Sequence, residues 1–252
     1  MEYIQILEKL KSLANPTAVV EMARYGINPN NNLGVSITSI RRIARETGKD
    51  HSLASELWES GIREARMLAV LKDEAKLVTG EQMDAWVGDF DSWDVCDHCC
   101  SALFRYTELA YQKAVEWSSD EREFVKRAGF VLMATLTVSD KKAPDEKFEP
   151  FLVLIKREAG DDRNYVRKAV NWALRQIGKR NPGLNKLAIE AAREIHTMGS
   201  KSARWIASDA LRELTGQPVQ QRLRRQHADQ TSTPGAESPE YGVSFSTIRS
   251  LS

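Results

Sequence analysis

The segment SWDVCDHCCSALF, residues 92–104, holds the side chains best suited to chemistry in this sequence. Trp93 and Asp97 are four residues apart, so a helix places an aromatic ring and a carboxylate on one face. Such a pair suits a cationic ligand: a ring face attracts positive charge by about 0.5 to 2 kcal/mol, and a carboxylate about 4 Å away adds roughly 4 kcal/mol at an effective dielectric near 20. The alternative interpretation is an Asp in the N-terminal turn of the helix beside a Trp at the core boundary.

The same segment contains Cys96, His98, Cys99 and Cys100, which suggest a zinc site. On one helix, however, His98 points about 100° or more away from Cys99, so the four side chains cannot converge on a tetrahedral ion. We interpret the cysteines as small core residues and expect no metal. The sequence also lacks a Walker loop and the GxGxxG, GxSxG and HExxH motifs, so we expect no nucleotide or other cofactor.

A second unusual residue is Arg127, in the segment FVKRAGFVLMATLTV, residues 124–138. This segment is apolar nearly all round, which predicts a buried helix with an arginine set into it. A buried guanidinium needs an anion. Two partners are open: Asp97, in a structural salt bridge, or a bound phosphate.

The window from Arg163 to Ile189 holds seven basic residues and no acid, in a protein whose net charge is only +1. On a helix, one face is an apolar stripe formed by Val166, Ala169, Val170, Ala173, Leu174 and Ile177. The other face carries Lys168, Trp172, Arg175 and Lys179. A tryptophan within a basic stripe fits the docking of a polyanion. A solvated face, with Trp172 packed under a neighbouring helix, is the alternative.

Helical periodicity without alternating strands predicts an all-α fold as far as about Thr215. The expected helices include Ser92 to Tyr106, Asp120 to Val138, Pro144 to Ala159 and Arg163 to Lys179. A basic-then-apolar pattern recurs from Phe124, Tyr165 and Ser202, at intervals of 41 and 37 residues. This spacing favours a solenoid of HEAT-like helix pairs with a concave basic face, on which Arg127, Lys168 and Arg204 would lie.

Two segments depart from this pattern. Residues 216–252 are polar and rich in Ser, Thr, Pro and Gly, so we predict a helical domain over residues 1–215 followed by a mostly disordered tail. The loop NPNNNLG, residues 28–34, precedes a helix start and has amides that could hold a phosphate; we favour a plain turn. No apolar run could span a membrane, the clustered cysteines fit a reducing compartment, and we expect a cytoplasmic monomer.

With these residues in place, the sequence resembles the AlkD-type DNA alkylation repair enzymes, a family of HEAT-like repeat alkylpurine DNA glycosylases. The resemblance rests on LGVSITSIRRIAR from Leu33, WDVCD from Trp93, FVKRAGFVLM from Phe124 and NYVRKAVNWALRQIGKRN from Asn164. It implies that Asp97 is the catalytic carboxylate, and that Trp93 and Trp172 are active-site aromatics. It also implies that Arg127 contacts backbone phosphate. The adjacent Lys126 is the alternative for this contact, because the match to the family leaves a shift of one residue open.

The implied function is hydrolysis of the N-glycosidic bond of cationic N3- or N7-alkylated purines in duplex DNA, without base flipping. Lys168, Arg175 and Lys179 would add DNA contacts from the basic stripe. The sequence differs from the family pattern at Ser92, where an additional aromatic is common, and the family includes members that bind DNA without excision. The alternatives are therefore a catalytically silent HEAT-repeat DNA-binding protein and a protein-binding helical scaffold.

Overall fold

The computed structural model describes residues 1–231, which form helices joined by turns and contain no strand. The α-helices are α1 (Tyr3–Ser12), α2 (Pro16–Arg24), α3 (Ile37–Thr47), α4 (His51–Glu59), α5 (Arg63–Lys72), α6 (Gly80–Gly88), α7 (Trp93–Ala102), α8 (Ala110–Trp117), α9 (Glu123–Ser139), α10 (Glu149–Glu158), α11 (Asn164–Gly178), α12 (Pro182–Thr197), α13 (Lys201–Leu214) and α14 (Gln217–Thr231). Short 3₁₀ turns lie at Phe104–Tyr106 and Asp145–Lys147. The all-α prediction is confirmed.

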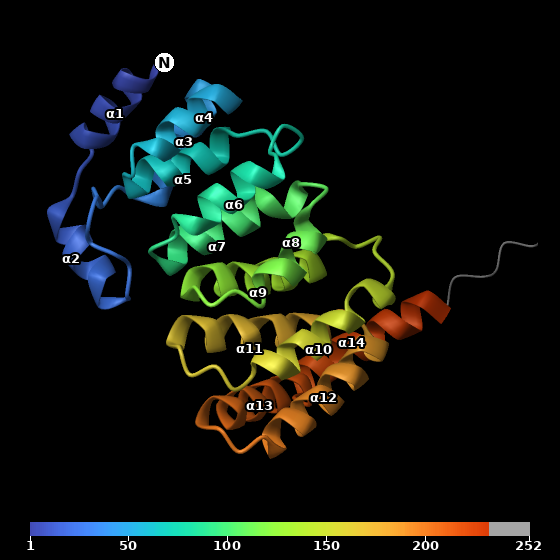
Figure 1. The fold of residues 1–252 in the computed structure, drawn as a ribbon. Coiled ribbons are helices and arrows are strands. Elements are labelled where there is room, and N and C mark those ends of the chain that lie inside the picture. The colour runs from blue at the N-terminus through green and yellow to red at the C-terminus, as the bar shows by residue number, and fades with distance from the viewer. Residues whose placement is uncertain (232–252) are drawn as a thin grey trace, which may run out of the picture.

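The helices stack in a regular array (Figure 1). From α3 to α13, each odd-numbered helix packs against the next odd-numbered one, and α4, α8 and α12 each pack against the odd-numbered helix that follows. We call the layer formed by α3, α5, α7, α9, α11 and α13 the inner layer. Each of its helices contacts only near neighbours, as in HEAT-like repeats. The helices that begin the three predicted repeats, α9, α11 and α13, are neighbours in this layer.

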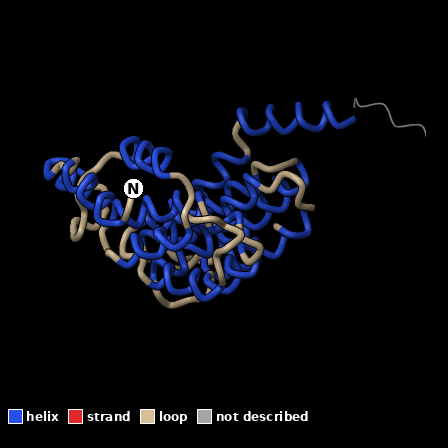
Figure 2. The backbone as a smooth tube through the Cα atoms, turned by 90° about the horizontal axis from the view of Figure 1, so that it is seen from above, coloured by secondary structure: helices blue, strands red, loops and turns tan. Residues whose placement is uncertain are grey.

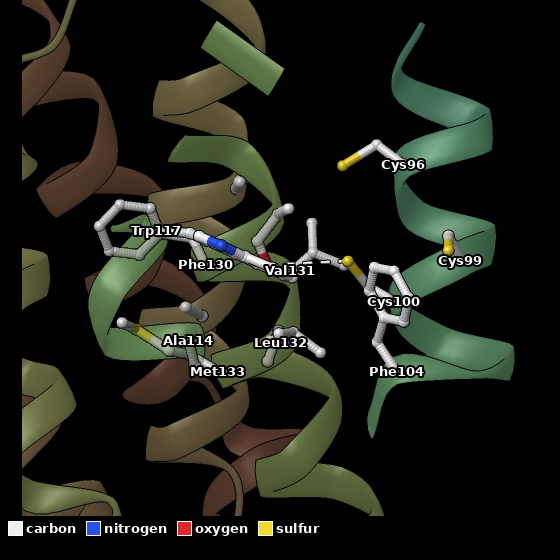
Figure 3. Close-up of a cluster of buried hydrophobic side chains, with 14 of the residues drawn as sticks. Cys96, Cys99, Cys100, Phe104, Ala114, Trp117, Phe130, Val131, Leu132 and Met133 are labelled. Carbon is white, nitrogen blue, oxygen red and sulfur yellow. Dashed lines mark hydrogen bonds between the residues drawn. The ribbon is translucent and has the colours of Figure 1, made fainter. Parts of the chain in front are cut away.

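The centre of the array is α9, which is buried on nearly every side. Small residues let its neighbours approach closely: a Cβ on Gly129 would lie 2.6 Å from the backbone nitrogen of Ser118. Cys96, Cys99 and Cys100 are fully buried between α7 and the rest of the core (Figure 3). The interpretation of the cysteines as core residues is therefore confirmed. The apolar stripe of α11 is also buried throughout.

Two predicted boundaries differ from the structure. The expected helix from Pro144 to Ala159 is interrupted, and α10 starts only at Glu149 with Pro150 in its first turn. Proline fits there because the first helical N–H groups have no partner within the helix. The expected long helix from Ser92 to Tyr106 ends at Ala102 and continues as a 3₁₀ turn.

Helix α14 lies where we expected the polar tail to begin, and it extends away from the array (Figure 2). Its first turns are attached, because Val219 and Leu223 are buried and Gln220 Nε2 donates to Asn185 Oδ1 at 3.0 Å. In the sequence, Val219 and Leu223 are only two apolar residues at helical spacing, too few to predict this docking. The remainder of the predicted tail, 232–252, lies outside the described residues. Within residues 1–231, no helix is long and apolar enough to cross a membrane.

Candidate functional site

Asp97 and Arg127 form a two-pronged ion pair between α7 and α9. Arg127 Nε donates to Asp97 Oδ1 at 2.8 Å, and Arg127 Nη2 donates to Asp97 Oδ2 at 2.7 Å. The Arg127 side chain is 7% exposed and the Asp97 side chain 21%. Of the two anions considered for Arg127, the structure therefore contains the carboxylate. Because an ionised carboxylate can accept about two hydrogen bonds at each oxygen, Asp97 keeps acceptor capacity on its exposed side.

The environment of this pair has opposing effects on Asp97. Burial raises the pKa of Asp97 above its ordinary value of 3.8, while the hydrogen bonds and the charge of Arg127 oppose that rise. The pKa of Arg127 is raised, since the bonds to Asp97 outweigh the burial that would lower it. The two hydrogen bonds from Arg127 hold the Asp97 carboxylate in one orientation.

Trp93 lies one helical turn before Asp97 and lines the same cleft, as the spacing of four residues predicted. Its indole Nε1 donates to the backbone oxygen of Tyr25 at 3.0 Å, so the ring is fixed against the turn that ends α2. The cleft has a volume of about 680 Å³ and is open to solvent; it is lined by Ala23, Arg24, Tyr25, Gly26, Trp93, Asp97, Arg127, Asn164, Tyr165 and Lys168. It joins an indole, a carboxylate and exposed cations at one place.

Tyr165, which sequence reasoning missed, connects three parts of the cleft. Its backbone oxygen accepts a hydrogen bond from Arg127 Nη1 at 2.7 Å, and its hydroxyl donates to the backbone oxygen of Gly26 at 3.1 Å. Tyr165 lies three residues before Lys168, so helical spacing alone could have placed both on one face. Tyr25, a 77% exposed aromatic at the rim, was also missed. Nothing local to its sequence indicates that the turn after α2 contacts α7 and α11.

Gly26 makes this close approach possible. Its φ of +77° favours glycine, and a Cβ there would lie 1.9 Å from the hydroxyl oxygen of Tyr165. Helix α2 itself has no buried residue. Its end is held against the array by the two hydrogen bonds from Trp93 and Tyr165.

The structure does not bring every predicted site residue into the cleft. Lys168 is exposed and lines it. Trp172 lies one turn further along α11, partly buried against the core and outside the cleft lining. Lys126 does not line the cleft: its Nζ lies 2.5 Å from a carboxylate oxygen of Glu158 and 3.5 Å from one of Asp161.

The basic stripe of α11 is largely neutralised by α13. Glu213 accepts from Arg175 Nη1 at 2.5 Å and from Lys179 Nζ at 2.6 Å. These bonds lower the pKa of Glu213 against the opposing effect of burial. The absence of acids from this stretch of sequence therefore does not mean that the surface is strongly positive. The acid that pairs with its basic side chains is on α13, more than thirty residues later in the sequence.

The amides of the NPNNNLG loop are also occupied by a side chain of the protein. Glu64 is fully buried and accepts from the backbone nitrogens of Leu33 and Val35, at 2.9 and 3.2 Å. Asn32 Oδ1 accepts from the nitrogen of Gly34 at 2.9 Å. The loop is a structural turn, as we favoured, in which a carboxylate fills the place considered for phosphate.

The chain is similar to several known proteins. It is 25% identical over 195 residues to an uncharacterized protein of Listeria innocua, across 76% of this chain and 85% of the relative. It is 23% identical, with the same coverage, to an uncharacterized protein of Listeria monocytogenes. A solved structure reported as "a new family of proteins related to the HEAT-like repeat DNA glycosylases with affinity for branched DNA structures" has a TM-score of 0.71 at 18% identity, over 84% of this chain and 95% of that chain. This likeness identifies a HEAT-like repeat fold.

The model of the DNA alkylation repair enzyme family matches residues 6–214, which include every helix of the inner layer and all residues of the cleft. This span is most of the 252-residue chain. The chain therefore belongs to the DNA alkylation repair enzyme family.

Proposed function

We propose that the protein binds duplex DNA and hydrolyses the N-glycosidic bond of cationic N3- or N7-alkylated purines. The observation that carries the proposal is the cleft in which the Trp93 ring and the Asp97 carboxylate face solvent together. A carboxylate beside an indole suits a sugar that develops positive charge as its bond to the base breaks. Lys168 and Arg24, at the rim of the cleft, are exposed and suited to backbone phosphates.

The proposed reaction places few demands on the protein. Alkylation gives the purine a positive charge, so the electron pair of the C1′–N bond leaves with the base, which becomes neutral. Water then forms the new bond to C1′ and loses a proton to Asp97 or to solvent. Asp97 opposes the positive charge of the sugar and orients the water, an interaction stronger in the transition state than in the ground state. The proposed reaction uses side chains of one chain and requires no metal or cofactor. We propose that the protein acts as a monomer in the cytoplasm.

The openness of the cleft supports action on a base that remains in the duplex. An enzyme that flips a base surrounds it with a fitted pocket, whereas this cleft is open to solvent and is bounded by α2, α7, α9 and α11. Trp93 and Tyr25 would then contact the deoxyribose and backbone of the lesion. Trp172, one turn away on α11, would meet the flanking strand.

A catalytically silent DNA-binding protein is the second candidate. The observation that favours it is the engagement of both Asp97 oxygens by Arg127, which reduces the negative field in the cleft. The solved neighbour reported to have affinity for branched DNA structures belongs to a family only related to the glycosylases. A base-release assay on methylated duplex DNA separates the two: we expect free 7-methylguanine from the first, and DNA binding without release from the second.

DNA binding itself is tested by its salt dependence. Contacts between Lys or Arg and phosphate release counterions, so we expect log Kd to rise steeply with log salt concentration. Lys168→Glu should weaken binding to all sequences alike, because a phosphate contact carries no base information. No DNA binding at low salt would leave the third interpretation, a protein-binding helical scaffold.

A further inference from the structure

A groove between α10 and α12 takes no part in the proposed function. It has a volume of about 500 Å³ and shares no residue with the cleft that contains Asp97. The two helices pack against each other and lie outside the inner layer (Figure 1). We call this surface the α10–α12 groove. It is separate from the surface that we propose for DNA.

The floor of the α10–α12 groove is apolar and incompletely covered. Val153 of α10 is 62% exposed and lines the groove beside the buried Leu152. Leu187 and Ala191, one helical turn apart on α12, line it from the other side. A single exposed valine needs no explanation. Here, however, the valine adjoins further apolar side chains in a concave surface, which suits contact with apolar side chains of a ligand.

The rims of the groove are acidic. Four glutamates line it together with only one basic residue, Lys156. Lys156 Nζ is paired with Glu194 at 2.7 Å. The other three side chains, Glu146, Glu149 and Glu190, are exposed and make no hydrogen bond or ion pair with any of residues 1–231. Three carboxylates without counter-charges attract a cationic ligand and repel a polyanion such as DNA.

The acids lie on both sides of the apolar floor. Asn181, just before α12, donates to Asp145, just before α10, at 2.8 Å. Lys156 meets Glu194 near the other ends of the same helices. The two helices therefore run in the same direction, with Glu149 on one rim and Glu190 on the other. From Glu149 to Lys156 the groove runs about 10 Å along α10, which is about two turns of a helix laid along it.

We propose that the α10–α12 groove is the docking site for a basic amphipathic helix of a partner protein. The apolar face of that helix covers Val153, and its Lys or Arg side chains pair with Glu146, Glu149 and Glu190. A groove between two packed helices accepts the side chains of a third, and an amphipathic helix in an apolar groove is a recurring mode of recognition. Charge complementarity at the rims selects a basic helix over an acidic one.

Helix α14 shows a similar mode of docking within the chain. Val219 and Leu223, one turn apart, are buried where α14 packs on α12 and α13, while Arg224 and Arg225 are exposed. The α14 of a second copy does not fit the α10–α12 groove in this way, because its two large aliphatic side chains are already buried on its own chain. The occupant must supply an apolar face of its own, which favours a different protein.

A synthetic probe tests the groove. The probe is a helical peptide of about 15 residues, with leucines at helical spacing along one face, lysines on both sides of that face and a fluorescent label. A control peptide carries glutamates in place of the lysines. Binding to the full chain is measured by fluorescence anisotropy over a range of salt concentrations. We expect the lysine peptide to bind, more weakly as salt rises, and the glutamate peptide not to bind.

Two variants separate the charged part of the contact from the apolar part. Glu149→Gln/Glu190→Gln should weaken binding of the lysine peptide about fivefold and reduce its salt dependence. Val153→Asn should weaken binding by a similar factor at every salt concentration, because it removes apolar contact area. The matched control is Glu56→Gln/Glu59→Gln on α4, where both side chains are exposed and make no hydrogen bond or ion pair with residues 1–231. It should bind as the wild type does.

Four results overturn the proposal. The first is no binding of the lysine peptide to the full chain. The second is equal loss of affinity in the groove variant and the α4 control. The third is unchanged affinity in Val153→Asn, which would indicate a contact through charge alone, as a polyamine makes. The fourth is self-association of the wild type in sedimentation velocity that Glu149→Gln/Glu190→Gln abolishes, which would assign the groove to a second copy.

The groove and the proposed excision are tested independently. Because the groove shares no residue with the cleft, release of 7-methylguanine should be the same for the wild type, Val153→Asn and Glu149→Gln/Glu190→Gln. Peptide binding without base release would leave the groove and remove the glycosylase proposal. Base release without peptide binding would remove the groove alone.

Discussion

The ion pair between Asp97 and Arg127 gives a quantitative prediction for catalysis. A carboxylate about 4 Å from the developing positive charge contributes about 4 kcal/mol at an effective dielectric near 20, and a guanidinium about 8 Å away opposes it by about 2 kcal/mol. Asp97→Asn removes the favourable part and leaves the unfavourable part, so base release should fall about a thousandfold. Asp97→Asn/Arg127→Met removes both, and the net loss of about 2 kcal/mol predicts a fall of only about thirtyfold.

The same substitutions have predictable effects on stability. Asp97→Asn leaves a guanidinium that is 7% exposed without its carboxylate. Breaking a buried pair in this way costs about 3 to 5 kcal/mol; because Asp97 is 21% exposed, we expect about 3 kcal/mol, or a fall in Tm of about 6 to 12 °C. Arg127→Met in the double variant replaces the orphaned charge with an apolar chain and should restore most of that loss.

The assay measures unfolding and single-turnover release of 7-methylguanine on the same protein preparations, at a temperature where each variant is folded. Asp94→Asn is the matched control. Asp94 is on the same helix, is also bound by an arginine through Arg63 Nε at 2.7 Å, and does not line the cleft. It should lose stability as Asp97→Asn does, with little change in release by the folded protein.

Three results would contradict this reasoning. Unchanged release by a folded Asp97→Asn protein would remove Asp97 from the mechanism and leave it a structural role. Equal release by Asp97→Asn and the double variant would show that the charge of Arg127 does not act on the sugar. A fall in release for Asp94→Asn as large as for Asp97→Asn would show that the assay reports stability alone.

Three further predictions follow from the cleft and the chain end. Since burial raises the pKa of Asp97 and the ionised form is the active one, release should decline as pH falls through a value above 3.8, and a pH–rate profile checks this. Gly26→Ala would place a Cβ 1.9 Å from the Tyr165 hydroxyl oxygen at a positive φ, so hydrogen exchange in residues 16–26 should rise while the rest of the array is unaffected. Truncation after Leu214 exposes the surface that α14 covers and should lower the free energy of unfolding by about 2 to 4 kcal/mol. Truncation after Thr231 should change it by less than about 1 kcal/mol. Both are measured by denaturant unfolding, and equal effects would contradict the docking of α14.

The sequence determined the features that depend on the period of a single helix. The helical class and the buried stripe of α11 follow from which residues recur every three or four positions. The burial of α9 follows from a segment that is apolar nearly all round. The common face of Trp93 and Asp97 has a related origin, since four residues make slightly more than one helical turn. The requirement that Arg127 meet an anion also followed from composition, because an apolar helix cannot hold an unpaired guanidinium.

Only the tertiary structure decided which groups meet across helices. The carboxylate of Asp97 was chosen for Arg127 by the packing of α7 on α9, and Glu213 neutralises Arg175 because α13 lies beside α11. The turn at Gly26 enters the cleft through two long-range hydrogen bonds that no local pattern encodes. Periodicity fixes the direction in which a side chain leaves its own helix, but the rotation and offset between helices are set by the fit of whole surfaces, and these determine which charges remain free for a ligand.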